Sequence, residues 1–147
     1  MRIYLAGPLF NVAERSFNVR LAAALNDLGY AIWLPQINEP REKTAKAVFQ
    51  KDVEGIDWAN VVVANLDGPD PDSGTCWECG YAYKKKPVIV FRTDMRAGDD
   101  PKLTPCNLML WESATERLSL LCETTVQEIA RLIDWELKDI EKHGTTT

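Results

Sequence analysis

The segment from Val61 to Gly68, with the sequence VVVANLDG, is an unbroken apolar run that stops at turn-forming residues. A short valine-rich run of this kind is typical of a strand that is buried on both faces. Such strands occur mainly in parallel sheets that helices cover on both sides. The segment therefore predicts an α/β domain, and the residues around it indicate how the sheet is built.

Strands and helices are predicted to alternate along the rest of the chain. The other β-rich runs are RIYLAG, AIWLP, PVIVFR and RLSLLC, which begin at residues 2, 31, 87 and 117. Helical spacing of apolar residues predicts helices over 13–28, 43–59 and 124–142, another that runs to about residue 84, and a short turn or helix over 107–113. Gly29 is expected to end the first helix. We predict a single doubly wound, flavodoxin-like (Rossmann-like) domain over residues 1–147 with a five-stranded, mostly parallel sheet.

The composition is that of an ordinary soluble domain and excludes several classes of partner. The 147 residues are 46% hydrophobic and 27% charged, and the formal net charge is −5. Nucleic-acid polymers normally require a basic face, so a small-molecule partner is expected instead. No apolar run approaches the roughly 20 residues that cross a bilayer, and the first residues do not resemble a signal peptide. We expect a cytoplasmic protein without a membrane partner.

The chain contains one histidine, His143, close to its end. A Ser-His-Asp triad, a Cys-His pair or a histidine-rich metal site is therefore nearly excluded. Neither of the common glycine-rich phosphate-binding motifs occurs, which argues against a dinucleotide or nucleoside triphosphate site of the usual kind. If the protein is an enzyme, carboxylates are expected to carry its acid–base and nucleophilic chemistry.

Cys76 and Cys79 form a C-x-x-C motif with Glu78 between them. A redox motif needs a lowered thiol pKa, whereas Glu78 and the nearby Asp72 would raise it. A structural zinc site needs about four ligands, and the other cysteines do not form a second close pair. We therefore interpret Cys76 and Cys79 as free thiols that pack against the sheet.

The carboxyl ends of the first and third strands are expected to form the ligand site. In a doubly wound sheet, ligands bind outside these ends, where the strand order reverses. The two ends read YLAGPLF and NLDGPDPDSGT, and the second carries the aspartates Asp67, Asp70 and Asp72. Glu78 follows in the next helix, where an acidic residue also has the simpler role of complementing the helix dipole. Asp52 shares a helical stripe with apolar residues, which makes it a second candidate.

Several of these segments together resemble the nucleoside 2-deoxyribosyltransferase family. They are IYLAGPLF, DVEGIDWANVVVANLDG, DSGTCWECGYAYKKKPV and PCNLMLW, in this order, and the resemblance covers about residues 2 to 112. It implies a flavodoxin-like fold and the exchange of one base for another on a 2′-deoxyribonucleoside. It also implies no cofactor or metal, and a homo-oligomer, a dimer or larger, whose active sites are completed by a neighbouring chain.

The resemblance assigns catalytic roles to four residues. Glu78 would be the nucleophile, and Tyr4 would orient it through a hydrogen bond. Asp72 and Asp52 would contact the base and the sugar hydroxyls, and one of them would assist proton transfer to the leaving base. A raised pKa in that acid would follow from crowding of the three carboxylates.

The resemblance also implies substrate-binding residues. Gln36, which follows the second strand, would contact the base, and Gly7 lies at the end of the first strand. Asn107 would reach the sugar 5′-hydroxyl of a neighbouring subunit, with Met109 beside it. The substrates would be deoxyribonucleosides and free nucleobases, in a nucleotide-salvage role.

Simpler structural roles and two other functions stay open at this point. Asp72 and Asn107 could only cap helices, and Tyr4 could be an ordinary strand aromatic. A related activity is hydrolysis of 2′-deoxynucleoside 5′-phosphates, for which Arg15 and Ser16 leave an option although AGPLFNVAERS lacks the expected phosphate loop. A non-catalytic nucleotide-binding module is a further alternative. The sequence decides neither the range of bases nor the role of the loop over 93–105.

Overall fold

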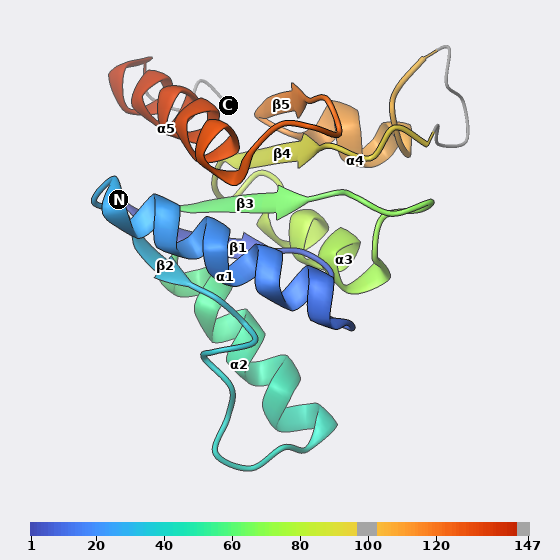
Figure 1. The fold of residues 1–147 in the computed structure, drawn as a ribbon. Coiled ribbons are helices and arrows are strands. Elements are labelled where there is room, and N and C mark those ends of the chain that lie inside the picture. Colours follow the sequence, from blue (N-terminus) through green and yellow to red (C-terminus); the bar gives the residue numbers. More distant parts are fainter. Residues whose placement is uncertain (97–102, 144–147) are drawn as a thin grey trace.

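A computed structural model describes residues 1–96 and 103–143 of the chain, and the predicted alternation of strands and helices is confirmed (Figure 1). The strands are β1 (Arg2–Ala6), β2 (Ala31–Trp33), β3 (Val61–Asn65), β4 (Val88–Arg92) and β5 (Glu116–Ser119). The helices are α1 (Val12–Asp27), α2 (Ala45–Trp58), α3 (Ser73–Ala82), α4 (Leu108–Ser113) and α5 (Val126–His143). All five strands are shorter than the predicted runs, and β2 and β5 end well before them, at Trp33 and Ser119. β2 ends at Trp33 because the next backbone N–H, that of Leu34, bonds to the Asn38 side chain at 2.9 Å. β5 ends at Ser119, close to a turn in which Thr124 N–H bonds to Leu121 O.

Within the described residues the sheet has five strands in the order β2–β1–β3–β4–β5, and every neighbouring pair is parallel. The sequence predicted a mostly parallel sheet, and the edge strand β5 proves to be parallel as well. The chain leaves β1 toward one edge and later returns to β3 on the other side of β1. The reversal of strand order therefore lies between β1 and β3, as predicted, and the strand arrowheads in Figure 1 point to the side of the molecule where ligands bind in such sheets.

Helices cover both faces of the sheet, and alternate residues of each strand contact different helices. Ile3 and Leu5 of β1 belong to a core shared with α1 and α5. Tyr4 and Ala6 face the other way, into a core formed with α2 and α3. The residues of β3 are all buried, as predicted for a strand that is covered on both faces. Tyr4 is thus directed toward the helices that carry Asp52 and Glu78.

Gly29 ends α1, as predicted. Its φ of +94° lies in the left-handed region, where a side chain would be strained, and its N–H bonds to Asn26 O at 2.9 Å. This turn brings the chain directly into β2, which begins at Ala31.

The helix α2 is fixed at its C-terminal end and along one side. The Lys86 ammonium donates hydrogen bonds to Ile56 O and, at 2.7 Å, to Ala59 O, which satisfies carbonyls that the helix leaves free. On the side facing the sheet, Gly55 lies against the indole of Trp33, and a Cβ atom added there would be 2.3 Å from Trp33 Nε1. Trp33 is the register partner of Tyr4. The absence of a side chain at Gly55 therefore sets how closely α2 approaches the strands beside the site.

We expect Gly55→Ala to destabilise the protein by about 1–2 kcal/mol, although alanine favours helix by about 1 kcal/mol. The added methyl group overlaps a rigid ring, so either α2 or the indole must move. Chemical denaturation measures the change. Gly80→Ala on α3 is the matched control, because a Cβ atom there meets nothing within 4 Å and should leave stability equal or higher. Equal effects of the two substitutions would contradict this account.

Buried polar contacts join the loops that follow β3 and β4. Arg92 is 2% exposed, and its guanidinium donates hydrogen bonds to Leu66 O and, at 2.8 Å each, to Gly68 O and Arg96 O. The Asp67 carboxylate accepts from Thr93 N–H at 2.6 Å and from the Thr93 hydroxyl at 2.7 Å. The Asp67 carboxylate is thus occupied by hydrogen bonds that join the two loops. Of the loop over 93–105, residues 97–102 lie outside the described part of the chain.

None of the helices in residues 1–96 and 103–143 is long and apolar enough to span a lipid bilayer.

Candidate active site

Tyr4 and Glu78 form a hydrogen-bonded pair between the sheet and α3. The Tyr4 hydroxyl donates to Glu78 Oε1 at 2.5 Å, although the two residues are 74 positions apart in the sequence. Tyr4 is completely buried and Glu78 partly buried. The hydrogen bond engages the carboxylate oxygen Oε1 and leaves Oε2 free of this bond. The pairing expected from the resemblance is present in the structure.

The environment of Glu78 raises its pKa to about 7. Burial is the main cause, because the charged form loses solvation, and the charges of Asp52 and Asp72 add to it. The hydrogen bond from Tyr4 acts in the opposite direction and stabilises the carboxylate. Burial and the neighbouring carboxylates also raise the pKa of Tyr4, so its hydroxyl stays a donor. A carboxyl group with this pKa changes its charge near neutral pH.

Asp52 faces the pair from α2. Its side chain is partly buried, and burial raises its pKa. Its charge acts on both Glu78 and Tyr4. The predicted apolar stripe around Asp52 holds toward the C-terminal end of α2, where Ile56 is buried, but Val48 is 40% exposed. Asp52 therefore lies on α2 between a buried part of the helix, at Ile56, and a more exposed part, at Val48.

Asp72 is the N-cap of α3. Its Oδ2 accepts hydrogen bonds from Thr75 N–H at 2.8 Å and from the Thr75 hydroxyl at 3.0 Å. Asp72 thus has the helix-capping role that was considered as the simpler alternative. Its other carboxylate oxygen, Oδ1, is free of these two bonds. Thr75 is 1% exposed and was not among the site residues predicted from the sequence. The signal was a threonine three residues after a capping aspartate, a pattern that fixes the orientation of the carboxylate.

Gly7 and Gln36 lie at the carboxyl ends of β1 and β2, as predicted. A Cβ atom at Gly7 would be 3.1 Å from Asn65 Cβ, so the loop after β1 packs closely on the end of β3. Gln36 is 7% exposed, and both ends of its amide are bonded inside the protein. One of its partners is Asn18 of α1, which was not predicted from the sequence. The signal was a polar residue on the buried side of α1, three positions before Leu21.

Asn107 and Met109 are located at the start of α4. Asn107 caps this helix by accepting a hydrogen bond from Met109 N–H at 3.0 Å. The Met109 side chain is 71% exposed. In the described part of the chain, no hydrogen bond joins either residue to Glu78.

The cysteines of the C-x-x-C motif have raised pKa values. Burial, followed by the charges of Asp72 and Asp70, raises the pKa of Cys76, and burial and Glu78 raise that of Cys79 to about 12. Cys79 packs in the core as predicted, whereas Cys76 is only partly buried. Both thiols are thus poor nucleophiles. Among the described residues, no group of three or more histidine, cysteine, aspartate or glutamate side chains is arranged to hold a metal ion.

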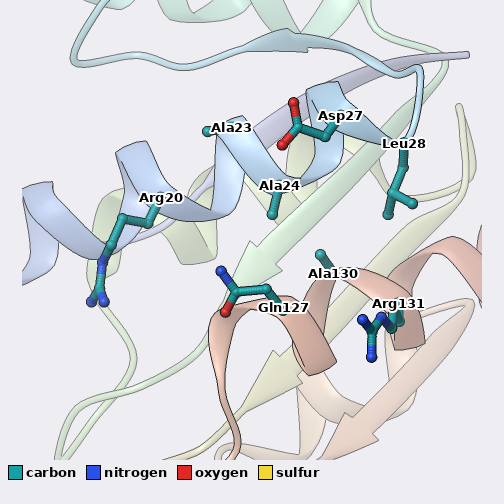
Figure 2. A pocket seen from close by; sticks show the side chains of 8 residues that line it. All are labelled: Arg20, Ala23, Ala24, Asp27, Leu28, Gln127, Ala130 and Arg131. Carbon is teal, nitrogen blue, oxygen red and sulfur yellow. The ribbon is translucent and has the colours of Figure 1, made fainter.

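A cavity of about 360 Å³ lies between α1 and α5 (Figure 2). Ala24 of α1 and Ala130 of α5 line it, together with polar side chains that include Arg20, Gln127 and Arg131. These helices cover the face of the sheet opposite to Glu78. The cavity is therefore separate from the acidic site.

The sequence matches the family described as nucleoside 2-deoxyribosyltransferase over residues 3–109. No match was found among curated protein sequences.

Solved structures resemble the chain over most of its length. A 2-deoxyribosyltransferase from Bacillus psychrosaccharolyticus is 28% identical, with a TM-score of 0.69 and coverage of 88% of this chain and 90% of that one. A conserved protein from Enterococcus faecalis is 26% identical, with a TM-score of 0.73 and coverage of 92% and 98%. A CMP N-glycosidase from Clostridium botulinum has the same fold at 16% identity, with a TM-score of 0.63 and coverage of 92% and 99%.

Proposed function

The chain belongs to the nucleoside 2-deoxyribosyltransferase family, and we propose that it transfers the 2-deoxyribosyl group between nucleobases through a covalent ester on Glu78. The observation that carries this proposal is the Tyr4–Glu78 hydrogen bond at the ligand-binding edge of the sheet. It leaves one carboxylate oxygen free, on a residue whose pKa of about 7 allows ionisation at neutral pH. The substrates are 2′-deoxyribonucleosides and free purine or pyrimidine bases.

In the first half of the reaction, Glu78 Oε2 attacks C1′ of the deoxyribose. The C1′–N bond breaks through an oxocarbenium-like transition state, its electron pair goes to the leaving base, and a C1′–O ester forms. The absence of a 2′-hydroxyl eases the positive charge at C1′. The departing base takes a proton from Asp52 or Asp72. Burial raises the pKa of Asp52, which favours the protonated form that such an acid needs.

In the second half, a nitrogen of the incoming base attacks C1′ and the ester bond breaks. The electron pair of that bond returns to Glu78 as a carboxylate, and the proton of the incoming base returns to the aspartate. Two inversions at C1′ preserve the configuration. Tyr4 keeps Oε1 bonded, so the carboxylate does not rotate between the two steps.

The loop after β1 favours nucleosides over nucleoside 5′-phosphates, which the related hydrolases would use. Glu14 Oε2 accepts hydrogen bonds from Phe10 N–H at 2.7 Å and Asn11 N–H at 3.2 Å at the start of α1. The N–H of Asn11, the N-cap residue, is one of the donors that a phosphate could use at this helix N-terminus, and the glutamate adds a negative charge there. The capped loop therefore opposes a phosphate group.

Product analysis tests the proposal. Deoxyadenosine or thymidine is incubated with an unlike free base and without it. Base exchange that requires the acceptor, together with a deoxyribosyl adduct mapped to Glu78 by mass spectrometry, is expected. Release of free deoxyribose at the same rate with and without acceptor would indicate a hydrolase. No turnover of any deoxynucleoside or its 5′-phosphate would indicate a non-catalytic binding module.

We further propose a homo-oligomer in the cytoplasm, with a role in nucleotide salvage. Support comes from the start of α4, where Leu108 and Met109 are 49% and 71% exposed beside Asn107. An exposed apolar pair next to an asparagine of the family motif fits a segment that completes a neighbouring site.

We expect Tyr4→Phe and Asp52→Asn to shift the pH dependence of kcat/KM in opposite directions. Activity requires ionised Glu78, so kcat/KM falls as the pH drops through about 7. Tyr4→Phe removes a hydrogen bond to the carboxylate, which raises the Glu78 pKa and moves the acid limb to higher pH. Asp52→Asn removes a negative charge and moves it to lower pH. Shifts in the same direction, measured from pH 4.5 to 9, would contradict this account.

A further inference from the structure

Asn18 links two loops of the proposed site through its side-chain amide. It lies in α1 and is 5% exposed. Its Nδ2 donates to Pro8 O at 2.9 Å and to Gln36 Oε1 at 3.1 Å. Gln36 in turn donates from Nε2 to Arg15 O at 3.0 Å. The result is a buried chain of hydrogen bonds from the loop after β1, through Asn18 and Gln36, to the backbone of α1.

The two ends of this chain fix the orientation of both amides. Pro8 O and Arg15 O are backbone carbonyls, which can only accept hydrogen bonds. Asn18 must therefore present its NH₂ group to Pro8, and Gln36 must present its NH₂ group to Arg15. Rotation of either amide by 180° would place two oxygens against each other in a buried position, which is costly. Gln36 is thus held with its Oε1 toward Asn18, and one N–H and one lone pair of its amide remain.

These residues lie at the ligand-binding edge of the sheet. Pro8 follows β1 by two residues and Gln36 follows β2 by three. The position of a Cβ atom at Gly7 is 3.1 Å from Asn65 Cβ and 3.8 Å from Asn18 Oδ1. Gly7 therefore packs against the end of β3, and Asn18 holds the next residue, Pro8, beside the Gln36 loop.

We infer that Asn18 is a positioning residue that determines base preference by fixing which donor and acceptor of Gln36 face the base. This inference rests on the proposed function, in which Gln36 contacts the base. A base with a 6-amino group and one with a 6-oxo group demand opposite partners at the same place. Sites that read hydrogen bonds discriminate strongly between such groups, because a mismatch leaves a buried polar atom unpaired. An amide free to rotate would serve both.

The test compares adenine and hypoxanthine as acceptors for Asn18→Ala. The ratio of their kcat/KM values is expected to move toward one by about tenfold, because Gln36 is released from its fixed orientation. Asn26→Ala, an exposed substitution on the same helix, is the control and should leave the ratio unchanged. A ratio within twofold of the wild-type value in Asn18→Ala would overturn the inference, even if the variant loses stability, because lost stability alone lowers activity with both bases equally.

A second measurement tests the fixed amide orientation in the wild-type protein and depends neither on the folding of the variant nor on base exchange. Amide hydrogen exchange of the wild-type side chains is followed by NMR. Both Nδ2 protons of Asn18 and one Nε2 proton of Gln36 are expected to exchange slowly. Rapid exchange of these protons would refute the fixed orientation. Slow exchange in a protein without transfer activity would refute the proposed function and not the amide network.

Discussion

Replacing Glu78 with glutamine is expected to lower base exchange by about 10⁴-fold or more and to stabilise the protein above neutral pH. The first effect follows because an amide oxygen is too weak a nucleophile to form the ester with C1′. Glutamine retains the shape of the side chain and an oxygen that can accept the Tyr4 hydrogen bond. Loss of activity would therefore reflect the missing carboxylate and not a disturbed site.

The second effect follows from the raised pKa. The folded protein holds the Glu78 proton more tightly than the unfolded chain, whose carboxyl group titrates near 4.5. Stability therefore decreases as the pH rises from about 4.5 through about 7 and stays lower above that range. With allowance for partial exposure, the penalty at pH 8.5 is about 2–3 kcal/mol, and glutamine removes it. The Tm of Glu78→Gln should exceed that of the wild type by about 6–10 °C at pH 8.5.

Thermal unfolding at pH 4.5 and pH 8.5 separates this effect from a general change in packing. The two proteins should unfold at similar temperatures at pH 4.5, where Glu78 is protonated in the folded state. Glu54→Gln is the control, since Glu54 is exposed on α2 and should show no comparable dependence on pH. Full transfer activity in Glu78→Gln would refute the mechanism. If Glu78→Gln and the wild type have equal Tm values at pH 8.5 as well as at pH 4.5, burial does not penalise the charged form of Glu78.

Asp72→Asn is expected to reduce transfer by about 10²–10³-fold with little change in stability. Asparagine caps helices about as well as aspartate, so its oxygen should keep the two hydrogen bonds from Thr75. The loss of charge at the start of α3 should cost at most about 1 kcal/mol. The amide cannot exchange a proton with the base, which removes a contribution typical of general acid–base catalysis.

Rate measurements and unfolding of the same preparation distinguish the two roles of Asp72. Asp70→Asn, an exposed substitution two residues upstream, should retain wild-type transfer. If Asp72→Asn keeps more than about a third of the activity, Asp72 serves only as the helix cap and Asp52 becomes the proton donor. If Asp72→Asn loses much stability but transfers deoxyribose at the wild-type rate, Asp72 likewise serves only as the helix cap.

The fold could be predicted because its signals are local. The buried run beginning at Val61, the helical spacing of apolar residues and the turn at Gly29 each depend on neighbours in the sequence, and all correspond to observed elements. A parallel sheet then brings the ends of β1 and β3 together whatever the side chains are. This topology indicated the edge of the sheet where Asp72 and Glu78 lie, and the family resemblance then selected them as candidates before any contact was known.

The ends of elements and the orientation of β5 were less well determined. β2 stops at Trp33 because the Asn38 side chain takes the next backbone N–H, a local competition that strand propensity does not reveal. A strand at the edge of the sheet has one neighbour, so its sequence carries little information about direction. The parallel arrangement follows from the path through α4.

The contacts and the electrostatics of the site depend on how the chain folds. The Tyr4–Glu78 bond joins residues 74 positions apart, and the raised pKa of Glu78 depends on burial by segments from the whole chain. The amide network of Asn18 likewise requires two loops to meet. The sequence alone determined which secondary structures form and which edge of the sheet is acidic. Hydrogen bonds and desolvation depend on distances between remote residues, and those distances exist only in the folded chain.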